Sequence, residues 1–150
     1  GSTFSIYFPT VEAVNNVTNP SAEENIIGGD EVILVVEDEE HLLDVVTATL
    51  KSVGYNTLSA KDGAEGLEIY KEHFQKIDLV LSDLGLPKLS GDQMFNEMKN
   101  VNPGIKAIIA TGYIDVEKKE TLFNQGIKTI LHKPLQMSEL LRCVREILDL

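Results

Sequence analysis

The sequence predicts an α/β fold in which a doubly wound parallel sheet carries helices on both faces. Two observations lead to this prediction. Between residues 31 and 149, short apolar segments alternate five times with longer segments whose apolar residues recur at helical spacing. The first apolar segment is also continuous, as expected of a strand that is buried on both faces. Five β-α units in strict alternation imply parallel strands joined by right-handed crossovers.

The start of this pattern predicts a strand, a helix and a second strand. Residues 31–36 (Glu-Val-Ile-Leu-Val-Val) form the first strand. A helix follows over residues 39–53, with leucines and valines on one face. Gly54 ends this helix, because glycine readily adopts the left-handed conformation found after helix C-termini. Residues 55–59 predict the second strand.

The middle of the chain predicts the second helix and the third strand. Asp62 and Glu65 fit a capping box, which starts a helix through reciprocal bonds between side chains and backbone. Residues 77–81 predict the third strand. The segment 83–91 after it is rich in turn-forming residues.

The remaining elements repeat the alternation. Ser90 and Gln93 fit a second capping box, and the helix that follows turns Met94, Phe95 and Met98 to the core. Strand, helix, strand and helix then follow over residues 105–110, 115–125, 127–131 and 137–149.

Composition excludes several classes of function. Thirteen basic residues against 24 acidic ones give a formal net charge of −11. Nucleic acids and anionic membrane surfaces attract positive proteins, so we expect neither as a partner. The single cysteine, Cys143, has no partner for an internal disulfide, and no segment fits a signal peptide or a transmembrane helix. We therefore expect a reducing, cytoplasmic location.

Polar residues follow four of the predicted strands. Glu37 and Asp38 follow the first strand, Asp83 the third, Thr111 the fourth and Lys133 the fifth. The carboxyl ends of parallel strands meet at one edge of the sheet, where ligands bind in such folds. Three nearby carboxylates repel one another unless a cation intervenes, and oxygen ligands without His or Cys favour Mg²⁺.

These residues together indicate phosphoryl transfer. A lysine and a hydroxyl can bind the oxygens of an anion, and a carboxylate beside them can act as the nucleophile. Each residue alone fits a structural role, at a helix N-terminus, in a turn or on the surface. Their joint placement at one edge favours the functional interpretation.

At these positions the sequence resembles the receiver domain of two-component response regulators. The resemblance covers residues 31–149 and implies a flavodoxin-like sheet with strand order 2-1-3-4-5. Four motifs carry it: Val35-Val36-Glu37-Asp38-Glu39, Leu81-Ser82-Asp83-Leu84-Gly85-Leu86-Pro87 with Gly91, Ala110-Thr111-Gly112-Tyr113, and His132-Lys133-Pro134.

The resemblance implies a role for each site residue. Asp83 matches the phosphoacceptor, which takes its phosphoryl group from a phosphohistidine. Asp38, Asp83 and the backbone carbonyl of Gly85 match the direct Mg²⁺ ligands, and Glu37 matches an acidic residue that acts through a metal-bound water. Thr111 and Lys133 match the residues that bind the phosphoryl oxygens, and the Lys133-Pro134 bond is expected to be cis.

Two positions depart from the usual receiver pattern. Glu37 stands where many receivers have aspartate, and Ile130 stands where many have the Tyr or Phe that switches rotamer on phosphorylation. Isoleucine is β-branched, stiff at χ1 and has no ring to exchange between buried and exposed states. We therefore expect phosphorylation to affect mainly the loop from Thr111 to Asp115.

The N-terminal residues resemble a different family. Gly1-Ser-Thr-Phe-Ser-Ile-Tyr-Phe-Pro9 is similar to the final strand of a histidine-kinase ATP-binding domain. The expected organisation is therefore a kinase-domain remnant over 1–11, a linker over 12–29 and a receiver over 30–150. This organisation resembles the C-terminal end of a hybrid sensor histidine kinase. The ATP site is absent, so we expect phosphotransfer to the receiver but no kinase activity from this chain.

Two other functions remain open on the residues alone. An aspartate-nucleophile phosphatase usually shows Asp-x-Asp after the first strand, where this chain has Glu37-Asp38-Glu39. A flavin-binding module needs a phosphate-binding loop at the same point, where the acidic pair would repel phosphate. The expected phosphodonor is a phosphohistidine domain of the same kinase or a histidine phosphotransfer protein.

Overall fold

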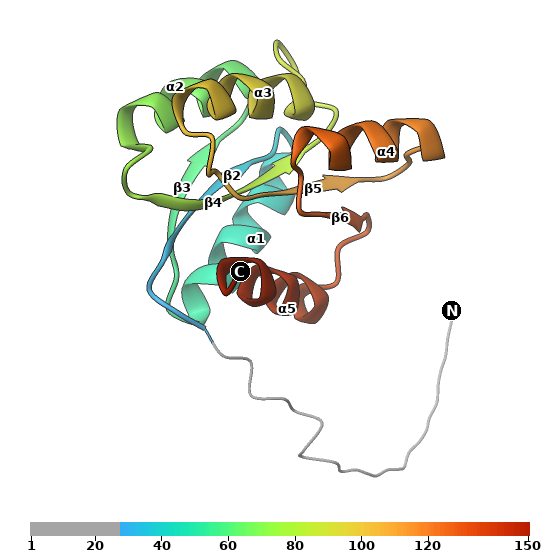
Figure 1. Cartoon of the computed structure of the whole chain (residues 1–150). Helices are drawn as coiled ribbons and strands as arrows, with labels where there is room; N and C mark the ends of the chain where they lie inside the picture. Colours follow the sequence, from blue (N-terminus) through green and yellow to red (C-terminus); the bar gives the residue numbers. More distant parts are fainter. Residues whose placement is uncertain (1–27) are drawn as a thin grey trace, which may run out of the picture.

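The computed structural model describes residues 28–150 (Figure 1). The expected kinase-domain remnant at 1–11 and residues 12–27 of the expected linker lie outside the described residues. No helix within 28–150 combines the length and the apolar character needed to cross a membrane.

Within residues 28–150, five parallel strands form one sheet in the order β3-β2-β4-β5-β6. Numbered along the chain, this is the order 2-1-3-4-5 that the resemblance implied. Neighbouring strands pair in parallel, as the strict alternation predicted. The strands are β2 (Val32–Val36), β3 (Asn56–Ala60), β4 (Ile77–Asp83), β5 (Ala107–Thr111) and β6 (Thr129–His132).

Helices cover both faces of the sheet, as Figure 1 shows. Helices α1 and α5 pack on one face, and α2, α3 and α4 pack on the other. They are α1 (Glu40–Ser52), α2 (Gly63–His73), α3 (Gly91–Val101), α4 (Val116–Gln125) and α5 (Met137–Leu148).

The central strand β2 explains why its sequence is continuously apolar. Ile33 and Val35 point into the core under α1 and α5, whereas Leu34 and Val36 point into the core under α2, α3 and α4. All four side chains are buried. A strand with helices on both faces has no solvent side on which polar residues would be favourable.

Two strands begin two residues later than predicted, and both of these differences come from turns. Ile105 donates its backbone N–H to Asn102 in a turn, so β5 starts at Ala107. Ile127 donates its N–H to the carbonyl of Leu122 at the end of α4, so β6 starts at Thr129. Both isoleucines are buried, which gives them the apolar pattern of a strand without its pairing.

The predicted helix ends are largely confirmed. Gly54 and Gly126 follow α1 and α4 with φ of 105° and 109°, the left-handed conformation. Asp62 accepts a hydrogen bond from the backbone of Glu65, but Glu65 bonds back to Lys61 rather than to Asp62. The first predicted capping box is therefore shifted by one residue.

Arg145 of α5 fixes the start of the described chain. Its guanidinium forms an ion pair with Glu31 at 2.8 Å and another with Asp149 at 2.9 Å. It also donates to the carbonyl of Gly28 and to the hydroxyl of Tyr55. The hydrogen bond from Arg145 lowers the pKa of Glu31. Gly28 and Asp149 are thus held by one side chain, at the end of the sheet where β2 begins.

Candidate functional site

The carboxyl ends of four neighbouring strands position the predicted site residues. Glu37 directly follows β2, Asp83 is the last residue of β4, Thr111 is the last residue of β5, and Lys133 directly follows β6. These strands are parallel neighbours, so their ends meet at one edge of the sheet.

Three carboxylates come together at this edge. Glu37, Asp38 and Asp83 each offer an oxygen, and these oxygens lie within 4.8 Å of one another. Glu37 is buried, Asp83 is half-buried and Asp38 is exposed. The backbone N–H of Glu39 donates to Glu37 Oε1 at 3.1 Å, which fixes the buried carboxylate.

Lys133 bridges two of these carboxylates. Its Nζ lies 2.8 Å from Glu37 Oε2 and 3.4 Å from Asp83 Oδ1. The backbone N–H of Lys133 donates to the carbonyl of Thr111 at 2.9 Å, and the Lys133-Pro134 bond is cis as the resemblance implied. The ammonium group thus reaches both carboxylates from the end of β6.

Burial and charge shift two pKa values in this cluster. Burial raises the pKa of Glu37, an effect that the hydrogen bond from Lys133 only partly offsets. Burial also lowers the pKa of Lys133, but the hydrogen bond with Glu37 and the charge of Asp83 outweigh it, so the net shift is upward. Lys133 is therefore a permanent cation at neutral pH.

The loop after β4 holds Asp83 in place. Leu84 donates its N–H to the carbonyl of Ala110, and Gly91 donates its N–H to the carbonyl of Leu84. The backbone N–H of Gly85 lies 3.4 Å from Asp83 Oδ1. A Cβ at Gly91 would lie 2.3 Å from the carbonyl oxygen of Asp83, so only glycine fits there. Gly85, the predicted carbonyl ligand, is exposed beside Asp83.

Thr111 is at the predicted edge, but its hydroxyl points to its own loop. Thr111 is buried, and its Oγ1 donates to the carbonyl of Tyr113 at 3.1 Å. Within residues 28–150, no hydrogen bond joins Thr111 to the acidic cluster. The structure thus brings Glu37, Asp38, Asp83 and Lys133 into contact distance, and Thr111 only to the same edge.

The sequence interpretation missed a supporting residue, Ser82. This buried serine donates its hydroxyl to the carbonyl of Asp83 at 2.8 Å, which stabilises the strand end. A single hydroxyl within the apolar run of β4 was the available signal.

The charges of the cluster fit a divalent cation. Three carboxylates and one ammonium leave a formal charge of −2, confined to an edge that is partly buried. The donors are all oxygens, which Mg²⁺ prefers. Glu37, Asp38, Asp83 and the carbonyl of Gly85 are the groups that would hold it.

A comparison with protein families decides the identity of the fold. The model of the response regulator receiver domain matches residues 33–145. This chain belongs to the response regulator receiver family. The four sequence motifs therefore come from a receiver, and the flavin and phosphatase alternatives are set aside.

Curated relatives of this receiver belong to longer proteins. The transcriptional regulatory protein GlrR of Escherichia coli is 33% identical over 117 residues, which cover 78% of this chain and 26% of that protein. The sensor kinase CckA of Brucella abortus is 28% identical over 157 residues, covering 99% of this chain and 17% of that protein. The chain thus spans about a quarter or less of the length of these relatives.

Solved receivers share the fold. A response regulator receiver domain from Clostridium thermocellum has a TM-score of 0.75 and 31% identity, covering 79% of this chain and 94% of that one. A CheY-like receiver from Methanospirillum hungatei has a TM-score of 0.76 and 30% identity, covering 81% and 95%. The CheX-CheY-BeF3-Mg complex of Borrelia burgdorferi has a TM-score of 0.75 and 25% identity, covering 78% of this chain and 88% of that one.

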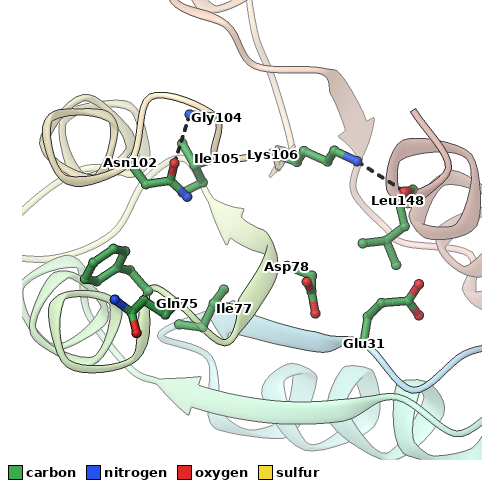
Figure 2. A pocket seen from close by; sticks show the side chains of 10 residues that line it. Glu31, Gln75, Ile77, Asp78, Asn102, Gly104, Ile105, Lys106 and Leu148 are labelled. Carbon is green, nitrogen blue, oxygen red and sulfur yellow. Dashed lines mark hydrogen bonds between the residues drawn. The ribbon is translucent and has the colours of Figure 1, made fainter.

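The receiver also has a groove at the opposite edge of the sheet, shown in Figure 2. Its volume is about 560 Å³, and Lys106 and Asp78 contribute charged groups to its wall. Lys106 donates to the carbonyl of Leu148, and Asp78 accepts the backbone N–H of Val32. These charged groups are already paired within the protein, and none of the predicted site residues lines the groove.

Proposed function

We propose that this receiver accepts a phosphoryl group from a phosphohistidine onto Asp83, with Mg²⁺, as the C-terminal part of a hybrid sensor histidine kinase. The observation that carries this proposal is the placement of Lys133 and two further carboxylates around Asp83. This is the arrangement that transfer to a carboxylate requires, namely a nucleophile, a fixed cation and a set of oxygen ligands.

The transfer moves one phosphoryl group between two residues. A carboxylate oxygen of Asp83 attacks phosphorus, so an O–P bond forms while the P–N bond of the phosphohistidine breaks. The imidazole nitrogen keeps the electron pair of that bond and takes a proton from solvent. Lys133 lies 3.4 Å from Asp83 and neutralises charge on the incoming oxygens, and the hydroxyl of Thr111 turns from Tyr113 to donate to one of them.

Glu37, Asp38, Asp83 and the Gly85 carbonyl are proposed to hold Mg²⁺. When bound, the metal supplies positive charge that offsets the repulsion between the carboxylates and the phosphoryl oxygens. The formal charge of −2 in the cluster supports this assignment. So does the likeness to the Borrelia CheY, whose solved complex contains BeF3 and Mg.

The hybrid-kinase context has separate support. The alignment with the sensor kinase CckA covers 99% of this chain and so includes nearly all of residues 1–29, whereas the alignment with GlrR covers 78%. The phosphodonor is then a phosphohistidine domain of the same kinase or a histidine phosphotransfer protein. We place the domain in the cytoplasm, where Cys143 stays reduced. Sequencing upstream of residue 1 tests this context: an ATP-binding domain supports it, and its absence contradicts it.

Phosphate incorporation tests the phosphoacceptor. We expect the wild-type chain to incorporate acid-labile phosphate from acetyl phosphate with Mg²⁺, and Asp83→Asn to incorporate none. Asp44→Asn is the matched control, because Asp44 is an exposed carboxylate of α1 away from the cluster. Undiminished incorporation by Asp83→Asn would refute the assignment.

A further inference from the structure

Helix α4 is held by less apolar packing than its neighbour α3. Leu122 is its one buried residue, whereas α3 buries the apolar side chains of Met94, Phe95 and Met98. Val116 and Phe123 of α4 are exposed by 72% and 42%. Burial of apolar side chains therefore contributes little to the free energy that keeps α4 packed on the protein. Polar contacts with α3 contribute a larger part of it.

One polar contact joins the N-terminal ends of the two helices. Lys118 Nζ of α4 lies 2.6 Å from Asp92 Oδ2 of α3. The other oxygen of Asp92 accepts the hydroxyl of Ser90 at 2.7 Å. The side chain of Asp92 is 13% exposed and that of Lys118 is 40% exposed, so water screens this pair only in part.

A second contact joins the C-terminal ends. Lys99 of α3 donates its ammonium group to the carbonyl of Gln125, the last residue of α4. The same ammonium lies 5.7 Å from the ring centroid of Phe95, which is buried. A cation suits this position, because the last carbonyls of a helix lack partners and carry partial negative charge.

Both helices begin close to the phosphoacceptor site. Asp92 follows the loop that begins at Asp83. Backbone hydrogen bonds of Leu84 and Gly91 hold this loop in place. Helix α4 begins five residues after Thr111, so residues 112–115 join Thr111 to α4 along the chain. Asp115 caps α4 by accepting the N–H of Lys118 at 2.7 Å.

We infer that the Lys118–Asp92 and Lys99–Gln125 contacts keep α4 docked on α3 when the Asp83 site is occupied, so that the response stays within residues 111–115. This inference rests on the proposed function of Asp83. Ile130 adds to the effect: it is partly buried against the core under α3 and α4 and has no ring that could move outward. The exposed Tyr113 is then the aromatic side chain that reports the state of the site.

Amide hydrogen exchange of the free chain tests whether the contacts hold α4. We expect exchange in residues 118–125 to be about fivefold faster in Lys118→Met and in Lys99→Met than in the wild type, with α5 unchanged. Lys119→Met removes the same charge from an exposed neighbour and should leave exchange unchanged. Equal exchange in Lys118→Met and Lys119→Met would overturn the inference.

Amide chemical shifts measured with and without beryllofluoride and Mg²⁺ test whether the response stays within residues 111–115. In the wild type and Lys119→Met, shift changes at 118–125 should be less than about a third of those at 111–115. In Lys118→Met the shift changes at 118–125 should become as large as those at 111–115. Large wild-type changes throughout α4 would overturn the inference. If the wild type shows no response at all, the proposed function fails, while the exchange measurement still decides whether α4 is held.

Discussion

Lys133 lies closer to Glu37 than to Asp83, at 2.8 Å against 3.4 Å, although 96 residues separate Lys133 from Glu37. The buried glutamate is therefore the principal partner of the ammonium group before any phosphoryl group arrives. Glu37 holds the lysine at the edge of the sheet, within reach of Asp83. A phosphoryl group on Asp83 would compete with Glu37 for the same cation.

Replacing Lys133 should slow phosphorylation without preventing folding. We expect Lys133→Met to incorporate phosphate at least about tenfold more slowly, because the fixed cation for the phosphoryl oxygens is lost. Lys128→Met, at an exposed position just before β6, is the control. Rates are measured with acetyl phosphate and Mg²⁺, and folding by circular dichroism. Equal rates in the two variants would show that Lys133 has no part in transfer.

Removing the proposed metal or one of its proposed ligands should impair phosphorylation. Excess EDTA should abolish phosphorylation, and Asp38→Asn should lower Mg²⁺ affinity about tenfold. Asp38 is exposed, so its loss should leave stability nearly unchanged. The chain contains no tryptophan, so calorimetry or NMR titration is the suitable measurement. Glu40→Gln is the matched control, and full phosphorylation in EDTA would contradict the prediction.

Substitution by alanine should lower the stability of the protein at Gly91 but not at Gly85. A Cβ at Gly91 would lie 2.3 Å from the carbonyl of Asp83, whereas a Cβ at Gly85 would have no atom within 4 Å. We expect Gly91→Ala to lower the free energy of unfolding by about 2 kcal/mol or more and to reduce phosphorylation. Gly85→Ala should leave the free energy of unfolding unchanged. Urea denaturation measures this, and equal stability of the two variants would contradict it.

The Arg145–Glu31 pair should make stability depend on pH. The pKa of Glu31 is lowered from 4.5 in the folded chain. The ionised carboxylate therefore stabilises the fold above pH 4.5, and this stabilisation is lost as the pH falls through the pKa of the folded chain. At pH 7, Glu31→Gln should lose about 1 kcal/mol of stability. This deficit should shrink below pH 4.5. Glu68→Gln, which changes an exposed carboxylate, should show no such deficit, and a constant deficit at all pH values would refute the prediction.

Sequence reasoning predicted the sheet and the site edge because both follow from local patterns. A strand is visible as an apolar run, and its carboxyl end is visible where polar residues begin, so Glu37, Asp83 and Lys133 could be assigned to one edge. Contacts between distant residues leave no such pattern. Asp92 and Lys118 are 26 residues apart, and each has the sequence appearance of an ordinary surface charge. The direction of the Thr111 hydroxyl depends on the conformation of the loop that follows it, so it could not be predicted from the sequence either.

The contacts of Arg145 have a practical consequence for protein engineering. One guanidinium holds Gly28 at the start of the described chain and Asp149 near its end, so these two positions are close together. Both lie at the edge of the sheet away from Asp83. A short glycine-serine bridge between residues 150 and 28 should therefore yield a circular permutant, reopened in a surface turn such as that around Gly104, with the edge that carries Asp83 undisturbed.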